Sequence, residues 1–176
     1  MTTITFMRHA QTEYNTKGLF CGTSDCSITQ EGANEAHKLR DELPKFDFYY
    51  CSPLRRTWET LHAIFPDVDF TVDSRVVEIC LGTWEGIPKT SVNQDLRKAF
   101  KSGNYTPKGA ESSESVQSRI KSFLSFIFET YTHDEKILVV THNGFLRELA
   151  RLIGVPPVTK NLEYLTVDSS LLIFKE

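Results

Sequence analysis

Residues 4–15 read ITFMRHAQTEYN, and this stretch joins a short apolar run to a neighbouring arginine and histidine. The apolar run predicts a β-strand, so Arg8 and His9 follow directly after a strand end. An imidazole and a guanidinium placed side by side suit the roles of a nucleophile and an anion clamp for a phosphate group. One such pair does not establish a site, so further groups must come from elsewhere in the chain.

Two other apolar runs end in residues of the same kind. Residues 137–144 read ILVVTHNG, in which His142 follows the run, and residues 46–56 read FDFYYCSPLRR, in which Arg56 follows. Open α/β sheets bind ligands beyond the carboxyl ends of their strands. Three strand ends that each deliver a histidine or an arginine therefore predict a phosphate pocket at one edge of a sheet.

Strand and helix signals alternate along the chain. We expect strands at residues 2–7, 46–51, 68–72, 137–141 and 165–174. Helices are expected after Thr29, from Pro53 with Ser52 as the N-cap, after Ser112 or Ser113, and at residues 145–153. Strands separated by helices of ~10 residues need crossover connections. The pattern predicts an α/β fold, a three-layer α/β/α sandwich with a mostly parallel central sheet.

Composition narrows the class of protein. A chain of 176 residues with 40% hydrophobic and 24% charged residues is typical of one globular domain, which we expect to span residues 1–176. No run approaches the ~20 apolar residues of a membrane span, and no signal-peptide pattern is visible, which favours a cytoplasmic protein. A net charge of -3 argues against bulk nucleic-acid binding but is compatible with a local basic pocket.

The cysteines show neither a CxxC pair nor the histidine spacing of a zinc site, so no metal is expected. We expect reduced thiols, with Cys51 and Cys80 buried. Cys21 lies in the loop after the Arg-His pair, where a thiol that faces a ligand and a thiol without a role are equally open interpretations.

Residues 88–108 are rich in basic side chains: Lys89, Arg97, Lys98, Lys101 and Lys108. A solvated helical face accounts for such a segment more simply than a lid over an anionic substrate. We adopt the first interpretation and keep the second as an alternative.

Several motifs together resemble the histidine phosphatase, or phosphoglycerate mutase-like, superfamily, and they occur in the family's order. Residues 8–15, RHAQTEYN, are similar to its RHGETxxN signature, and residues 52–60, SPLRRTWET, to its SPLxRAxQT segment. Residues 78–86, EICLGTWEG, resemble ExxxGxWEG, residues 109–112, GAES, resemble GGES, and residues 140–147, VTHNGFLR, resemble VSHGGxxR. The resemblance spans nearly the whole chain and implies a phosphoglycerate mutase-like fold.

The resemblance also implies a role for each matched residue. His9 would attack phosphorus and form a phosphohistidine, so its other ring nitrogen should donate to a carbonyl that fixes the tautomer. Arg8 and Arg56 would bind the phosphoryl oxygens, and His142 would donate to one of them. Glu78 would protonate the leaving alkoxide, its own proton retained by a pocket that disfavours a carboxylate or by the charge of the incoming phosphate.

Further candidates for binding phosphate or substrate are Asn15, Cys21, Gly22 and Asn143. Leu19 and Cys21 stand where many relatives carry an arginine and a polar residue, and this loss of charge leaves recognition of a second anionic group open. The scheme requires no metal and no other cofactor, because arginines and histidines supply the positive charge. Glu85 is a less favoured candidate for the acid.

Three functions are compatible with these residues: a phosphatase, a mutase that returns the phosphoryl group to its substrate, and a phospho-ligand binding protein without catalysis. Only residues 87–108 separate the Glu78 segment from the GAES segment, and so short a cover favours hydrolysis over transfer. The full set of catalytic residues argues against a binding protein. We predict a monomeric or homodimeric phosphatase of small phosphorylated metabolites, without nucleic-acid or membrane partners.

Overall fold

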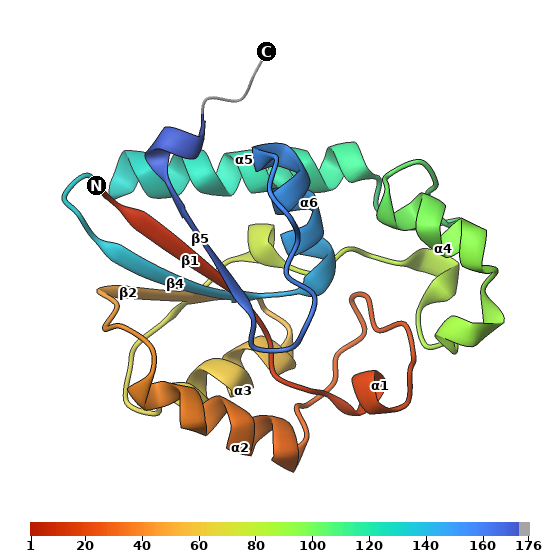
Figure 1. The fold of residues 1–176 in the computed structure, drawn as a ribbon, viewed down its shortest axis with the longest axis horizontal. Coiled ribbons are helices and arrows are strands. Elements are labelled where there is room, and N and C mark those ends of the chain that lie inside the picture. Colours follow the sequence, from red (N-terminus) through yellow and green to blue (C-terminus); the bar gives the residue numbers. More distant parts are fainter. Residues whose placement is uncertain (173–176) are drawn as a thin grey trace.

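The computed structural model describes residues 1–172, which contain one five-stranded sheet (Figure 1). The strands are β1 Thr3–Arg8, β2 Phe48–Cys51, β3 Thr71–Val72, β4 Lys136–Thr141 and β5 Tyr164–Asp168. Their order across the sheet is β3-β2-β4-β1-β5. Neighbouring strands are parallel except for the antiparallel pair of β1 and β5, so the mostly parallel sheet is confirmed.

Helices cover both faces of this sheet, which confirms the three-layer sandwich (Figure 1). On one face lie α2 Gln30–Lys38 and α3 Arg55–Ile64, and on the other lie α5 Ser113–Thr130 and α6 Asn143–Ile153. The short helices α1 Glu13–Thr16 and α4 Gln94–Lys101 lie beyond the carboxyl ends of the strands. Short 3-10 turns occupy Leu39–Asp41, Ser74–Val76, Gly82–Trp84, Lys89–Ser91 and Ser169–Leu172.

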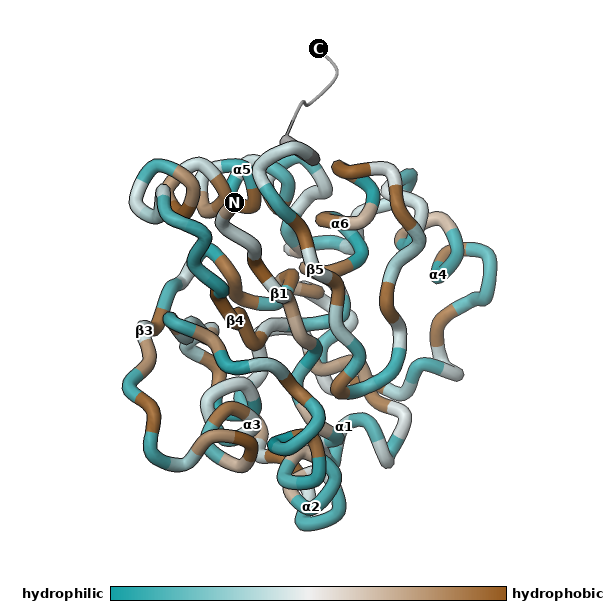
Figure 2. The backbone as a smooth tube through the Cα atoms, turned by 60° about the vertical axis from the view of Figure 1, so that its left-hand side comes forward, coloured by the Kyte–Doolittle hydropathy of each residue, from teal (hydrophilic) through white to brown (hydrophobic). Residues whose placement is uncertain are grey.

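Hydrophobic residues run along the central strands (Figure 2), and each face of the sheet has its own hydrophobic core. Ile4 and Phe6 of β1 pack in the core that contains α5 and α6. Met7 of β1 and Leu138 of β4 pack in the core that contains α2 and α3. This alternation with a period of two is the geometry of a strand buried on both sides.

The ends of three helices follow the local signals in the sequence. Thr29 caps α2 by accepting a hydrogen bond from the Gly32 N–H, and Ser112 caps α5 in the same way. Gly154 ends α6 with a left-handed φ of 74°. No helix within residues 1–172 combines the length and the apolarity needed to cross a membrane.

The expected helix cap at Ser52 is wrong. Helix α3 begins at Arg55, behind Leu54, whose side chain makes no cap. The Ser52 hydroxyl lies 2.7 Å from His142 Nε2 and 3.1 Å from Thr57 Oγ1, and it accepts a long hydrogen bond, 3.2 Å, from the Leu54 N–H. Because this hydroxyl is used across the sheet, the helix starts later than the sequence signal indicates.

Three expectations about strands and burial also need correction. Strand β2 is shorter than expected, and Phe48 remains 40% exposed because the two-residue strand β3 does not cover it. The last strand stops at Asp168, whose carboxylate accepts hydrogen bonds from Ser170 and turns the chain, while residues 173 and 174 lie outside the described part. Cys51 is buried as expected, but Cys80 is only half-buried.

Candidate active site

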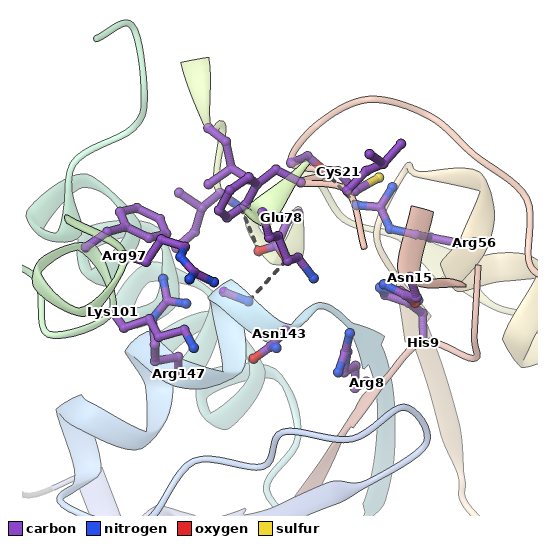
Figure 3. Close-up of a pocket in the computed structure, with 18 residues that line it drawn as sticks. Arg8, His9, Asn15, Cys21, Arg56, Glu78, Arg97, Lys101, Asn143 and Arg147 are labelled. Atoms are coloured by element: carbon purple, nitrogen blue, oxygen red, sulfur yellow. Dashed lines mark hydrogen bonds between the residues drawn. The ribbon is translucent and has the colours of Figure 1, made fainter. Parts of the chain in front are cut away.

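A pocket lies at the carboxyl ends of β1 and β4, between the signature loop, α4 and the start of α6 (Figure 3). The predicted site residues that line it are Arg8, His9, Asn15, Cys21, Gly22, Arg56, Glu78 and Asn143. The remaining predicted residue, His142, lies behind His9, with ring centroids 5.4 Å apart. The chain therefore brings all of these residues together at the expected edge of the sheet.

His9 is buried directly after β1, and one hydrogen bond fixes its tautomer. Its Nδ1 lies 2.7 Å from the carbonyl oxygen of Ala10, and a carbonyl oxygen can only accept. Nδ1 therefore carries the proton, as expected from the sequence, and Nε2 keeps its lone pair. Burial and the charges of Arg56 and Arg8 hold the pKa of His9 well below its ordinary value, so the ring is neutral at pH 7.

His142 is fully buried and is held by a residue that the sequence did not mark as functional. Its Nε2 lies 2.7 Å from Ser52 Oγ, and its Nδ1 is buried and makes no hydrogen bond within residues 1–172. Burial, followed by the charge of Arg56, lowers the pKa of His142 well below its ordinary value. A neutral His142 that accepts from the Ser52 hydroxyl carries its proton on Nδ1.

Arg56 is 1% exposed and is oriented by the loop that follows the signature. Its Nη1 donates to the Ser24 carbonyl at 2.9 Å and its Nη2 to the Gly22 carbonyl at 2.7 Å. A guanidinium has five N–H donors, so the others stay available to an oxyanion. Gly22 has a φ of +55°, and a Cβ there would lie 2.3 Å from Glu85 Oε1, so only glycine fits.

Glu85 supports this loop and is not a candidate for the acid. Its carboxylate accepts hydrogen bonds from the N–H and hydroxyl groups of Thr23 and Ser24 and from the Leu81 N–H. Burial alone would raise the pKa of Glu85, but these hydrogen bonds outweigh it and leave the pKa below its ordinary value. The less favoured assignment of the acid to Glu85 is therefore not supported.

Glu78 is held by its own neighbour in the chain and by the start of α6. Its carboxyl group accepts from the backbone N–H of Ile79 at 2.8 Å, of Gly144 at 3.1 Å and of Phe145 at 3.3 Å. A Cβ on Gly144 would lie 2.3 Å from Glu78 Oε1, so glycine is required for this approach. These three hydrogen bonds fix the position of the Glu78 side chain in the pocket.

Asn15 and Arg8 are held by the segment between α6 and β5. Asn15 Oδ1 accepts from the Thr12 N–H at 3.1 Å, in a capping box that starts α1, and from Asn161 Nδ2 at 3.2 Å. Arg8 Nη1 donates to the carbonyl of Thr159. Asn161 lies outside every matched motif, and nothing in the sequence marked it as part of the site.

Part of the basic segment lines the pocket, which corrects its interpretation as a solvated face for Lys89, Arg97 and Lys101; Lys98 and Lys108 are exposed and lie outside the lining. Figure 3 shows Arg97 and Lys101 of α4 and Arg147 of α6 at one end of the pocket, opposite Arg8, His9 and Arg56. Arg147 packs 4.9 Å from the centre of the Phe100 ring, and its Nε lies 3.8 Å from Glu148 Oε1. Its buried Nε and Nη2 make no hydrogen bond within residues 1–172. The positive charge at this end of the pocket contrasts with the uncharged Leu19 and Cys21 of the signature loop.

The pocket is strongly positive although the whole chain has a net charge of -3. The basic residues that line it are Arg8, Arg56, Lys89, Arg97, Lys101 and Arg147. Glu78 is the acidic residue of the lining. Burial and then the charge of Arg8 lower the pKa of Lys89. A pocket with this balance attracts a ligand that carries several negative charges.

The chain is similar to known proteins along most of its length. A family model described as histidine phosphatase superfamily (branch 1) matches residues 4–172. Phosphoserine phosphatase 1 of Hydrogenobacter thermophilus is 30% identical over 165 residues, covering 88% of this chain and 78% of that protein. A 2,3-bisphosphoglycerate-dependent phosphoglycerate mutase of Rhizobium etli is 29% identical over 188 residues, covering 98% of this chain and 86% of that protein. The structure of a phosphoserine phosphatase variant of Entamoeba histolytica in complex with phosphoserine has a TM-score of 0.81 at 25% identity. The match covers 94% of this chain and 90% of that protein.

Proposed function

The chain belongs to the histidine phosphatase superfamily (branch 1), as its motifs predicted, and we propose that it hydrolyses phosphomonoesters through a phosphohistidine on His9. The observation that carries the proposal is the hydrogen bond from His9 Nδ1 to the Ala10 carbonyl. It leaves a neutral Nε2 as nucleophile in a pocket that Arg8 and Arg56 make positive.

In the first step, His9 Nε2 attacks phosphorus while the bond from phosphorus to the alcohol oxygen breaks. Phosphoryl transfer depends mainly on positioning and on neutralising the three non-bridging oxygens. Arg8, Arg56 and the Nδ2 amide of Asn15 are placed to bind these oxygens. The unpartnered Nδ1 of His142 supplies a further donor as charge develops.

Glu78 handles the proton in both steps. The negative charge of the bound phosphate favours the protonated acid, which then gives its proton to the departing alkoxide. In the second step, Glu78 takes a proton from water, the water oxygen bonds to phosphorus, and the bond from phosphorus to His9 breaks. Inorganic phosphate and the original enzyme result. The scheme uses no metal ion, a proposal that phosphate release in the presence of a chelator tests directly.

We further propose that the substrate carries a second anionic group. Arg97, Lys101 and Arg147 face the end of the pocket opposite His9 (Figure 3). Phosphoserine, bound in one of the similar structures, combines a phosphate with a carboxylate at a short distance. A small phosphorylated acid of this kind fits the distribution of charge in the pocket.

A mutase is the second candidate, favoured by the Rhizobium etli relative named as one. The cover of the pocket argues against a mutase. It is short, and its helix α4 spans only Gln94–Lys101. Incubation with 3-phosphoglycerate distinguishes the two, because a mutase forms 2-phosphoglycerate and a phosphatase releases inorganic phosphate.

The proposal is tested by a screen of phosphomonoesters for phosphate release, with the wild type and His9→Ala side by side. We expect turnover of phosphorylated acids by the wild type and a loss of about 1000-fold or more in the variant. Brief reaction with a labelled substrate followed by denaturation should leave acid-labile phosphate on His9. A correctly folded protein that binds these esters without turnover or labelling would instead be a binding protein.

A further inference from the structure

Two thiols meet at the base of the loop that orients Arg56. Cys21 Sγ and Cys26 Sγ lie 3.4 Å apart, and both side chains are half-buried. Cys21 also lines the pocket, beside Arg56 (Figure 3). The four residues between the cysteines include Gly22 and Ser24, whose carbonyl oxygens hold the Arg56 guanidinium.

We propose that Cys21 and Cys26 form an oxidant-sensitive pair that a hydroperoxide converts to a disulfide, and that this disulfide lowers the activity of the pocket. The disulfide itself depends only on the two thiols. Its effect on activity rests on the proposed phosphatase function.

The environment of Cys26 favours the thiolate, which is the reactive form of a cysteine. The hydrogen bond with Cys21 lowers the pKa of Cys26 to about 6; burial opposes this shift and the positive charge of Arg56 assists it. The same contact with Cys26 raises the pKa of Cys21, so Cys21 retains its proton. Cys51 differs, because burial raises its pKa to about 12 and keeps it protonated.

The chemistry balances with one hydroperoxide for each disulfide. The Cys26 thiolate attacks one peroxide oxygen, the O–O bond breaks, and hydroxide leaves to become water, which gives a sulfenic acid. Cys21 sulfur then attacks Cys26 sulfur, the S–O bond breaks, and a second water leaves with the Cys21 proton. The two sulfurs lose two electrons together, and the peroxide gains them. A dithiol reductant reverses the process by thiol-disulfide exchange.

Closing the disulfide changes the positions of the sulfurs at both ends of the loop. A disulfide holds its sulfurs about 2.05 Å apart, whereas Cys21 Sγ and Cys26 Sγ are separated by 3.4 Å in the dithiol form. Cys21 Sγ lies 3.3 Å from the Ser24 carbonyl oxygen, an acceptor that Arg56 shares, and the disulfide removes the S–H that donates there. A displacement of about 1 Å in a group that binds the reacting phosphate can cost up to about 100-fold in rate.

The test begins with the reduced, full-length protein, treated with hydrogen peroxide and then with a maleimide under denaturing conditions. We expect the loss of two labelled thiols and a peptide in which Cys21 is joined to Cys26. We also expect kcat/KM for the best phosphomonoester to fall by about 10-fold or more, and dithiothreitol to restore it.

Two variants make the result specific. Cys26→Ser should form no crosslink and should keep the same activity before and after peroxide. Cys80→Ser, which removes another half-buried thiol, should oxidise and lose activity as the wild type does. Oxidation confined to Cys51 or Cys80, or oxidation of Cys26 that leaves the Cys21 thiol free, would overturn the disulfide. A crosslinked protein with unchanged kcat/KM would overturn its effect on activity, and a protein without phosphatase activity in any form would leave the thiol result intact.

Discussion

Each active-site histidine is oriented by one neighbour. Ala10 fixes His9 through its backbone carbonyl, and Ser52 contacts His142 through its side chain at 2.7 Å. A backbone contact cannot be removed by substitution, but a hydroxyl can. The two rings therefore differ in how directly their orientation can be tested.

Ser52→Ala leaves His142 Nε2 without its partner, so the ring can rotate or exchange tautomers. Loss of an orienting partner of this kind typically costs 10- to 100-fold, and we expect a fall of about 10-fold in kcat with little change in KM. Steady-state kinetics measure kcat and KM separately and so test this expectation. Ser52→Thr retains the hydroxyl and should recover part of the rate. Equal kinetics for Ser52→Ala and the wild type would show that this hydroxyl has no positioning role.

Glu78→Gln retains the shape of the side chain but can neither give nor take a proton. We expect kcat/KM on an alkyl phosphate, which reports the step that forms the phosphohistidine, to fall by about 100-fold or more. The loss should be milder on p-nitrophenyl phosphate, because nitrophenolate leaves without protonation. Comparing the two substrates measures the role in leaving-group protonation. Equal losses on both would argue against Glu78 as the proton donor.

Sequence motifs predicted the residues that touch the reacting phosphate, but not the residues that hold them. Arg8, His9 and Glu78 are recognisable because they recur in fixed motifs. Ser52 was mistaken for a helix cap, since a serine before a proline has the same local signal whether its hydroxyl turns to its own helix or across the sheet. Asn161 gives no local signal, because its contacts with His9 and Asn15 exist only after the chain has folded.

At the scale of single elements, α4 shows why a basic helix was misread. Arg97 and Lys101 lie four residues apart and so share one face, while Lys98 pairs with Asp95 on the exposed side. The spacing predicts which residues share a face. Whether that face meets water or a pocket depends on packing against α6, here through Phe100 and Arg147, which lies beyond the reach of local patterns.

Lys101→Met removes one positive charge from the α4 wall while keeping most of the apolar stem. For a substrate with a second anionic group we expect KM to rise about 10-fold, the effect of one charge-assisted hydrogen bond. For p-nitrophenyl phosphate, which lacks that group, KM should change little. Lys98→Met is the matched control on the same helix and should behave as the wild type. Equal effects of Lys101→Met on both substrates would argue against a second anion site at this wall.

At the scale of the whole molecule, strand order brings the two histidines together. Strands β1 and β4 are parallel neighbours, and their register pairs Arg8 with Thr141. A histidine follows directly after each of these two strands, and the His9 N–H donates to the Thr141 carbonyl at 2.9 Å. Residues from opposite ends of the chain therefore meet because the sheet aligns them, and the remaining groups are added by the helices and loops that follow.

The sheet places two neutral imidazoles side by side in buried, positively charged surroundings. The free energy of unfolding therefore depends on pH. In the folded chain the pKa values of His9 and His142 lie well below the ordinary value of about 6.5, to which they return on unfolding. Below pH ~6.5 the unfolded chain therefore binds protons that the folded chain does not. The contribution of each histidine to stability is complete above pH ~6.5 and falls by about 1.4 kcal/mol per pH unit toward its folded pKa.

Urea unfolding at pH values between 5 and 7.5 measures this dependence as the change in the free energy of unfolding. The wild type should lose stability more steeply below pH ~6.5 than His9→Gln, which has one such imidazole fewer. Carboxylates contribute equally to both proteins and cancel in the comparison. Identical slopes for His9→Gln and the wild type would mean that His9 accepts a proton as readily in the folded pocket as in water, and the neutral nucleophile would have to be abandoned.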